Sequence, residues 1–195
     1  MTKDALDLLD WKRRIFELYA YVREAPPDAA WRAWRDERQH LFATHPQTPD
    51  ADARPEYFDY DPAVRVLGEL RDAPPKELRL PVSRDEEIEA ERVGRVAFQL
   101  YGRDAALDAF WICGYGGGLF LPFRDLTSGT TTYGSGRYLY DTIKGADLGA
   151  EDGKLVLDFN FAYNPSCAYD PRWACPLAPP GNVLDLAVEA GERAP

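Results

Sequence analysis

The chain has 195 residues, 45 % hydrophobic and 13 % aromatic, which is enough to fold one domain around a sizeable core. Its net charge of −10 at pH 7 argues against nucleic acid or an anionic membrane surface as the main partner. The sequence has no run of 18 or more apolar residues that would predict a transmembrane helix, and its start lacks the basic-then-apolar order of a signal peptide. We therefore expect a cytoplasmic protein.

Two helices are predicted at the start of the chain. Over residues 4–24, apolar side chains recur at offsets of three and four, which is the spacing of an amphipathic helix. Pro26-Pro27 ends this helix, and Asp28 is placed to cap the next one, which continues to His45-Pro46. Residues 1–45 are thus predicted to form a helical hairpin, whose surface is a possible site for homo-oligomerisation or for another protein partner.

Residues 46–62 are predicted to connect this hairpin to the rest of the chain. The segment PQTPDADARPEYFDYDP is rich in proline and acidic residues, a composition typical of irregular structure. Its aromatic residues Tyr57, Phe58 and Tyr60 nevertheless need an apolar surface to rest on. We therefore expect the segment to pack against the domain.

From residue 63 to 195 the pattern is that of an antiparallel β domain. Strands are predicted at 64–70, 77–82, 95–102, 107–115, 119–123, 154–163 and 183–191, with one or two more within 130–143. Residues 83–92 are helical by propensity but fit a solvated strand end or a hairpin loop equally well. Short turns without regular helical crossovers indicate antiparallel pairing. The predicted fold class is α+β, mainly antiparallel β: a curled sheet or partial barrel with two N-terminal helices packed beside it, in one compact unit.

The segment FRDLTSGTTTYGSGRY (123–138) contains the first candidate site. Its glycines permit positive φ or close backbone approach, and Arg124 and Arg137 are forked donors that bind carboxylate or phosphate. The alternative is a glycine-rich hairpin in which these arginines pair with Asp125 and Asp141. The spacing does not match the phosphate-binding loop GxxxxGK[ST], so no nucleotide site is predicted.

The segment LDFNFAYNP (157–165) contains the second candidate site. On a strand, Asp158 and Asn160 would project from the same face, about 7 Å apart at roughly 3.3 Å rise per residue. If that face is a barrel interior, the two side chains form part of a polar pocket. If it is a solvent face, they are ordinary surface residues.

The three cysteines leave several roles open. Cys167 and Cys175 lie eight positions apart in a proline-flanked loop and suit structural thiols, metal ligands, or redox or catalytic thiols. A zinc site would need two more ligands, and no CxxC motif supplies them, so we predict structural thiols and no metal. Cys113, in the apolar run FWICGY, is predicted to lie in the core.

These motifs together resemble a bacterial and archaeal family known only as a domain of unknown function (number sixteen eighty-four). The resemblance runs from about Trp31 to Glu192, through WRAWRDERQHLFATHPQTP, YFDYDPAVR, LFLPFRDLTSGTTTYGSGRYL, LDFNFAYNPSCAYDPRWACPLAPPGN and the closing AGE. It implies no activity, cofactor or catalytic residue. It does coincide with the segments selected on their chemistry.

The leading functional hypothesis is a domain that binds a small anionic molecule without a cofactor. Arg124 and Arg137 would hold the charge, and the remaining ligand-binding candidates are Ser128, Tyr133, Asp158 and Asn160. The chief alternative is a hydrolase or lyase with Asp125 or Asp158 as general base and an arginine that stabilises developing negative charge. The third hypothesis is an interaction module that uses the two helices.

Overall fold

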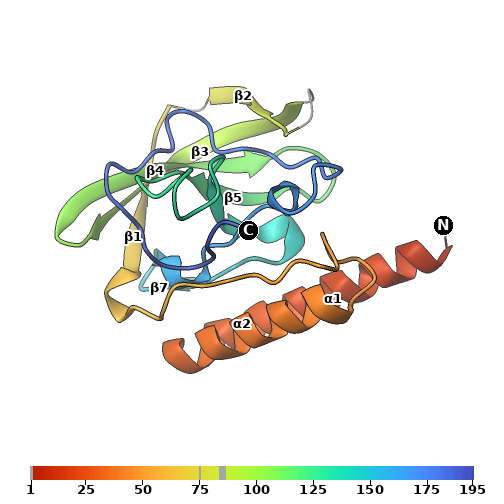
Figure 1. The fold of residues 1–195 in the computed structure, drawn as a ribbon. Helices are drawn as coiled ribbons and strands as arrows, with labels where there is room; N and C mark the ends of the chain where they lie inside the picture. The colour runs from red at the N-terminus through yellow and green to blue at the C-terminus, as the bar shows by residue number, and fades with distance from the viewer. Residues whose placement is uncertain (1, 75, 84–86) are drawn as a thin grey trace.

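Two N-terminal helices lie side by side against a curled antiparallel sheet (Figure 1). The computed structural model describes residues 2–74, 76–83 and 87–195. Helix α1 spans Thr2–Glu24 and helix α2 spans Pro27–Thr44, joined by a tight connection at the proline pair. The predicted α+β class, with its helices at the N-terminus and its curled antiparallel sheet, is confirmed.

Both helices bury one face against the sheet. Helix α1 buries Ile15, Leu18, Tyr19 and Val22, whereas Leu6 and Leu9 near its free end are 61 % and 50 % exposed. Helix α2 buries a longer face, with Ala30, Trp31, Trp34, Arg38, Leu41 and Phe42. Oligomerisation through the helices stays a prediction.

The predicted cap of the second helix is wrong. Asp28 lies inside the first turn of α2 and pairs with Arg32 at 2.9 Å, while the N-cap position is Pro26, which has no side chain able to cap. The reason is that Pro27 occupies the first helical position, where its missing N–H costs nothing, so the helix starts two residues earlier than expected.

The connecting segment packs on α2 through its aromatic residues. The ring of Tyr57 meets that of Trp34 at 5.5 Å between centroids, and Tyr60 meets Trp31 at 5.7 Å. The guanidinium of Arg193 lies 4.0 Å from the centroid of the Phe58 ring. The prediction that these aromatic residues need an apolar support is confirmed.

Within the described residues, eight strands form the sheet in the order β6-β5-β4-β3-β1-β8-β7, with β2 paired to β3. Their bounds are β1 Arg65–Arg71, β2 Lys76–Pro81, β3 Glu87–Leu100, β4 Arg103–Ile112, β5 Gly118–Phe123, β6 Arg137–Asp141, β7 Ala150–Glu151 and β8 Lys154–Asp158. All the pairs are antiparallel.

The first part of β3 resolves one open alternative. Residues 87–92, which have helical propensity, are strand because their backbone pairs with β2 on one side and, from Ala90 onward, with β4 on the other. Residues 84–86 of the same predicted segment lie outside the described residues.

Two predicted strands differ from the structure. The strand predicted at 154–163 ends at Asp158 and is followed by a 3-10 turn at Phe159–Phe161. The strand predicted at 183–191 is an irregular chain, drawn in blue in Figure 1, with isolated bridges at Val183 and Glu192. We call residues 182–193 the C-terminal strap.

The core lies between the helices and the sheet. Trp34 is fully buried at its centre and meets the rings of Tyr57 and Phe161 edge-on. A second, smaller cluster, Leu80, Ala90, Phe110, Phe120 and Tyr138, lies where β2 to β6 pack. The α1–α2 connection and the β7–β8 hairpin lie at the edge of this core. The candidate site described below lies between them.

Candidate functional site

Arg137 starts β6 and is only 1 % exposed. Its Nη2 donates to Oδ2 of Asp125 at 3.0 Å and to the carbonyl of Val188 at 2.9 Å. Its Nη1 donates to the carbonyls of Ala190 and Glu192. The guanidinium is therefore occupied by one carboxylate and three carbonyls of the strap, which is the pairing that the sequence left open as an alternative.

This arrangement explains why the strap is not a strand. Backbone carbonyls must be paired when they are buried, and a strand pairs them with a neighbouring strand. Here the guanidinium of Arg137 takes three of them, so the strap needs no strand neighbour along that stretch. Burial lowers the pKa of Arg137, and the charge of Asp125 opposes this shift.

Asp125 is equally occupied. Its Oδ1 accepts from the backbone N–H of Thr127 at 2.7 Å and from the hydroxyl of the same residue, while Oδ2 accepts from Arg137. Its exposed fraction is 5 %. Both oxygens thus serve the loop and the strap, and neither meets a pocket described below.

The other predicted ligand groups of this segment point to different places. Arg124 is exposed and makes no ion pair in the described parts of the chain, while its backbone pairs with Asn182 and Leu184 of the strap. Ser128 accepts from the backbone N–H of Asp125, and the Tyr133 hydroxyl lies 3.9 Å from Sγ of Cys167. Arg124 and Arg137 do not face one ligand together, since one is at the surface and the other is buried.

Asp158 and Asn160 do not share a strand face, which corrects the prediction. Asp158 is the N-cap of the 3-10 turn, and its Oδ1 accepts from the backbone and side-chain nitrogens of Asn160 at 3.0 and 2.8 Å. Asn160 also exchanges hydrogen bonds with the backbone of Asp61, at 2.8 and 2.9 Å. The side chain of Asn160 therefore ties the connecting segment to the end of β8.

Asp158 lines a pocket of about 400 Å³ between the α1–α2 connection and the β7–β8 hairpin. We call this the Asp158 pocket. One part of its lining is apolar (Val22, Ala25, Ala30, Leu148, Val156 and Phe161), and the other part is charged (Arg23, Glu24, Arg65, Glu151 and Asp158). An apolar wall with a few polar groups is the common make-up of a small-molecule site.

The second carboxylate oxygen of Asp158 is the unusual atom of this pocket. The side chain is 2 % exposed, and Oδ2 has no hydrogen-bond partner among the residues that the structure describes. Burial raises the pKa of Asp158, and the bonds from Asn160 and the charge of Arg65 only partly oppose it. The wall of the pocket thus includes a carboxyl group with one buried oxygen whose bonding capacity is unused.

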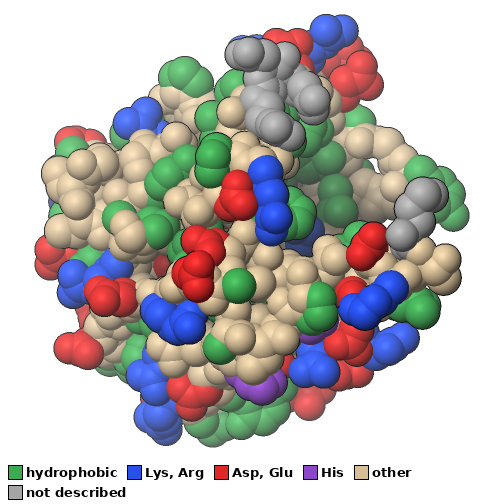
Figure 2. All heavy atoms as spheres, turned by 45° about the vertical axis from the view of Figure 1, so that its right-hand side comes forward, with side chains coloured by type: hydrophobic (Ala, Val, Ile, Leu, Met, Phe, Trp, Pro, Cys, Tyr) green, Lys and Arg blue, Asp and Glu red, His purple; other side chains and the backbone are tan. Residues whose placement is uncertain are grey.

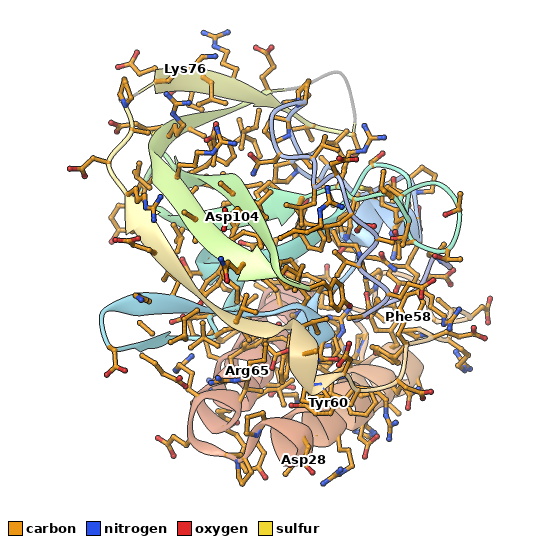
Figure 3. The ribbon with its side chains drawn as sticks, turned by 90° about the vertical axis from the view of Figure 1, so that its left-hand side faces the viewer. Asp28, Phe58, Tyr60, Arg65, Lys76 and Asp104 are labelled. Carbon is orange, nitrogen blue, oxygen red and sulfur yellow. The ribbon has the colours of Figure 1, made fainter. Side chains whose placement is uncertain are left out.

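Two arginines line the same pocket as Asp158. Nε of Arg65 lies 3.9 Å from Oδ2 of Asp158, too far for a hydrogen bond, and its Nη2 pairs with Glu151. Arg23 donates to the carbonyl of Asp147 at 2.9 Å. Figure 3 views this end of the molecule and shows Arg65 between the sheet and the helices, with Tyr60 beside it and Asp28 on the helix below.

The surface carries no broad field of one sign on the face drawn in Figure 2, where acidic and basic side chains are interspersed. Among the described residues, no group of three His, Cys, Asp or Glu side chains is placed to hold a metal ion. In the same part of the chain, no helix is long and apolar enough to cross a membrane.

The cysteines separate into a pair and a single residue. Cys167 and Cys175 are buried, and the N–H of Cys167 donates to Sγ of Cys175 at 3.3 Å. Cys113 is exposed, contrary to the prediction of a core position, because β4 ends at Ile112 and the chain turns outward through the glycine run.

The profile of a family described as "Protein of unknown function (DUF1684)" matches residues 53–193. The chain belongs to this family. The solution NMR structure of an uncharacterised protein from Haloarcula marismortui is also similar, with 36 % identity and a TM-score of 0.59, over 85 % of this chain and 92 % of that one. No curated protein matches. The resemblance stated from the motifs is confirmed, and the DUF1684 family brings no activity to the site.

Sequence reasoning found Asp158 but missed both arginines of the pocket. Arg65 and Asp158 lie inside the residues matched by the DUF1684 profile, whereas Arg23 precedes them. Arg65 ends the motif YFDYDPAVR and pairs with Asp158 across β1 and β8. The sequence did show an arginine after an Asp-Pro turn at the start of a predicted strand. Only the pairing of β1 with β8 connects this arginine to Asp158.

Proposed function

We propose that the protein binds a small polar molecule in the Asp158 pocket. A hydroxyl or amine of the ligand would donate to Oδ2 of Asp158, and a negatively charged group would lie near Arg65 and Arg23. The observation that carries the proposal is that Asp158 lines a pocket and that its buried Oδ2 atom has no hydrogen-bond partner among the described residues.

The unbonded Oδ2 atom of Asp158 has an energetic cost. A buried polar atom without a partner costs about 1–3 kcal/mol, so native proteins keep few of them. A ligand donor would remove that cost, which gives the pocket a built-in preference for molecules with a hydroxyl or amine at this point. The volume of about 400 Å³ fits a small metabolite.

The arginines proposed to bind the anionic group of the ligand are Arg65 and Arg23, in place of the pair expected from the sequence. Arg137, the strongest anion-binding candidate of the sequence, has both terminal nitrogens engaged by the protein. Arg65 is 27 % exposed at its side chain, and it can exchange its contact with Glu151, which is 50 % exposed, for a ligand carboxylate or phosphate. A cytoplasmic location for this function stays a prediction.

The test is a thermal-shift screen of hydroxy acids, amino acids and sugar phosphates on four proteins: the wild type, Asp158→Asn, Asp141→Asn and Arg65→Met. Asp158→Asn keeps the Oδ1 acceptor for Asn160 and replaces only the unpaired oxygen. Asp141→Asn is the matched control, because Asp141 is also a buried carboxyl with a raised pKa but does not line the pocket.

We expect a ligand at 100 times its Kd to raise the Tm of the wild type and of Asp141→Asn by about 5 °C, and to leave Asp158→Asn unshifted. Arg65→Met should weaken the anionic hits more than their uncharged analogues. Equal shifts for wild type and Asp158→Asn would reject the site.

A second function, catalysis by the same carboxyl group, is favoured by one observation. Asp158 combines burial, a raised pKa and a position in a pocket, which is the environment of a general acid or base. NMR of any hit incubated with wild type and with Asp158→Asn separates the two functions. Conversion by wild type alone indicates an enzyme, and an unchanged ligand spectrum indicates a binding protein.

A further inference from the structure

The thiol pair lies away from the Asp158 pocket, in the loop that follows β8. Cys167 belongs to a 3-10 turn at Ser166–Ala168 and is 9 % exposed, while Cys175 is 1 % exposed. The N–H of Cys167 donates to Sγ of Cys175 at 3.3 Å. The two cysteines are therefore neighbours in space, and no disulfide links them.

Hydroxyl groups from two other parts of the chain surround this pair. The Tyr133 hydroxyl lies 3.9 Å from Sγ of Cys167. The Ser83 hydroxyl donates to the carbonyl of Trp173 at 2.9 Å and accepts from the N–H of Cys175 at 3.1 Å. The Tyr133 hydroxyl thus lies beside the sulfur of Cys167, while Ser83 fixes the backbone of Cys175.

The two thiols differ in their exposure and in their hydrogen-bond neighbours. The bond from Cys175 and those from Ser83 and Tyr133 lower the pKa of Cys167 to about 6, although its burial opposes the shift. The pKa of Cys175 is raised, first by its interaction with Cys167 and then by burial. A thiolate is the nucleophilic form of cysteine, and a neighbouring thiol can resolve its oxidation product.

We propose that Cys167 and Cys175 form a dithiol site that a small hydroperoxide oxidises to a disulfide, with Cys167 as the attacking thiolate and Cys175 as the resolving thiol. The sulfur of Cys167 attacks the terminal oxygen of the hydroperoxide, an S–O bond forms and the O–O bond breaks. The other oxygen leaves and takes a proton to give water or an alcohol. Cys167 is then a sulfenic acid.

The second step closes the disulfide. Cys175 loses its proton and attacks the sulfur of Cys167, so that the S–S bond forms, the S–O bond breaks and the hydroxide leaves as water. Two thiols have lost two electrons in total, and the hydroperoxide has gained them. A small dithiol reductant returns the pair to the reduced state by thiol–disulfide exchange.

The burial of the pair selects the oxidant. With Cys167 only 9 % exposed, a hydroperoxide reaches the sulfur more easily than a bulky disulfide does. Cys113 provides an internal control, because it is exposed and, among the described residues, its sulfur is hydrogen-bonded to the carbonyl of Trp111 and not to a hydroxyl group or a second thiol. Reactivity of the pair in preference to Cys113 therefore reports the local chemistry and not exposure.

The closed disulfide would act on a loop that already anchors the connecting segment. Within this loop, the side-chain nitrogens of Arg172 and Trp173 donate to the carbonyl of Pro49 at 3.3 and 3.2 Å. Oxidation would therefore stiffen the contact between the loop and the segment that follows α2.

The test treats the reduced full-length protein with a slight excess of hydrogen peroxide, blocks free thiols by alkylation and maps the peptides by mass spectrometry. We expect a Cys167–Cys175 linked peptide, with Cys113 still alkylated, formed about tenfold faster than Cys113 is oxidised. In Cys175→Ser, a sulfenic-acid probe such as dimedone should label Cys167. In Cys167→Ser, Cys175 should stay a thiol.

Ser83→Ala and Tyr133→Phe test the proposal without removing a sulfur, so it stays falsifiable if a cysteine variant does not fold. Each should move the pH midpoint of Cys167 alkylation upward and slow disulfide formation several-fold, with an unchanged far-UV spectrum. The proposal is overturned if Cys113 is oxidised first, if dimedone labels Cys175 in Cys167→Ser as readily as Cys167 in Cys175→Ser, or if both hydroxyl variants react like wild type.

Discussion

Two Arg–Asp pairs in this molecule consist of the same residue types but differ in how completely their hydrogen bonds are made within the protein. In the Arg137–Asp125 pair, Nη2 of the arginine lies 3.0 Å from Oδ2 of the aspartate, and both side chains are 1 % exposed. In the Arg65–Asp158 pair, the atoms are 3.9 Å apart, Arg65 is 27 % exposed and Asp158 is 2 % exposed. The first pair is closed by hydrogen bonds to the strap, whereas the second leaves Oδ2 of Asp158 unbonded within the described residues.

The difference teaches how to separate architecture from function among buried charges. A charge taken out of water is tolerated when hydrogen bonds replace its hydration, and Arg137 and Asp125 meet that condition. Asp158 meets it with only one of its two oxygens. A buried group that folding leaves half-satisfied, next to a pocket, is where a ligand can contribute most.

The largest expected effect comes from removing the guanidinium of Arg137, which belongs to the fully hydrogen-bonded pair. Arg137→Met leaves Asp125 as an unpaired buried charge and frees three strap carbonyls, so we expect a loss of about 3–5 kcal/mol in the free energy of unfolding. Urea denaturation measures it. The matched control is Arg124→Met, an exposed arginine of the same segment, which should change stability by less than about 0.5 kcal/mol. Similar losses for both variants would show that Arg137 does not hold the strap.

The same comparison shows what the sequence could reveal. Periodicity predicted both helices and most of the sheet, because the helices bury regular faces and every strand pair except β1–β3 and β1–β8 joins strands that follow one another in the chain. It failed at the strap, where an alternating pattern suggested a strand. The guanidinium of Arg137 binds there instead, and side-chain to backbone bonds across 51 residues or more leave no periodic signal.

The site was only partly predictable for a similar reason. Asp158 was identified by its residue type, but its role depends on which oxygen folding leaves unbonded, and this is decided by the 3-10 turn that ends β8. Arg65 enters the pocket through the pairing of β1 with β8, and Arg23 enters through the packing of α1. Such long-range juxtapositions are not written in any local motif.

A second test compares the packing of the strap with that of the β7–β8 turn. Each contains a glycine with a φ of 74°, and each glycine is replaced by alanine. A Cβ at Gly191 in the strap would overlap the carbonyl oxygen of Ala162 and lie 2.9 Å from that of Phe159, whereas a Cβ at Gly153 in the β7–β8 turn meets nothing within 4 Å. Both alanine variants pay about 1–2 kcal/mol for the left-handed backbone. Gly191→Ala should lose about 1–3 kcal/mol more, measured as the difference in urea midpoints. Equal losses would mean that the strap is not closely packed.

The smallest expected effect is the pH dependence of stability that comes from Asp158. The pKa of Asp158 is raised above its ordinary value of 3.8, so the unfolded state loses this proton first as the pH rises. The wild type should therefore lose stability relative to Asp158→Asn as the pH rises above 3.8, until the folded carboxyl is also ionised. We expect a final gap of about 1 kcal/mol, the low end of the cost of a buried unsatisfied group.

Urea denaturation of both proteins between pH 4 and pH 8 measures this gap directly, and Asp141→Asn serves as a positive control because burial also raises the pKa of Asp141. A gap that stays constant across this range would mean that Oδ2 is hydrated in solution, and the contrast with the Arg137–Asp125 pair would then disappear. A gap that closes on addition of a ligand from the screen would link the unbonded oxygen to binding. The stability deficit and the affinity would then be two measurements of one missing hydrogen bond.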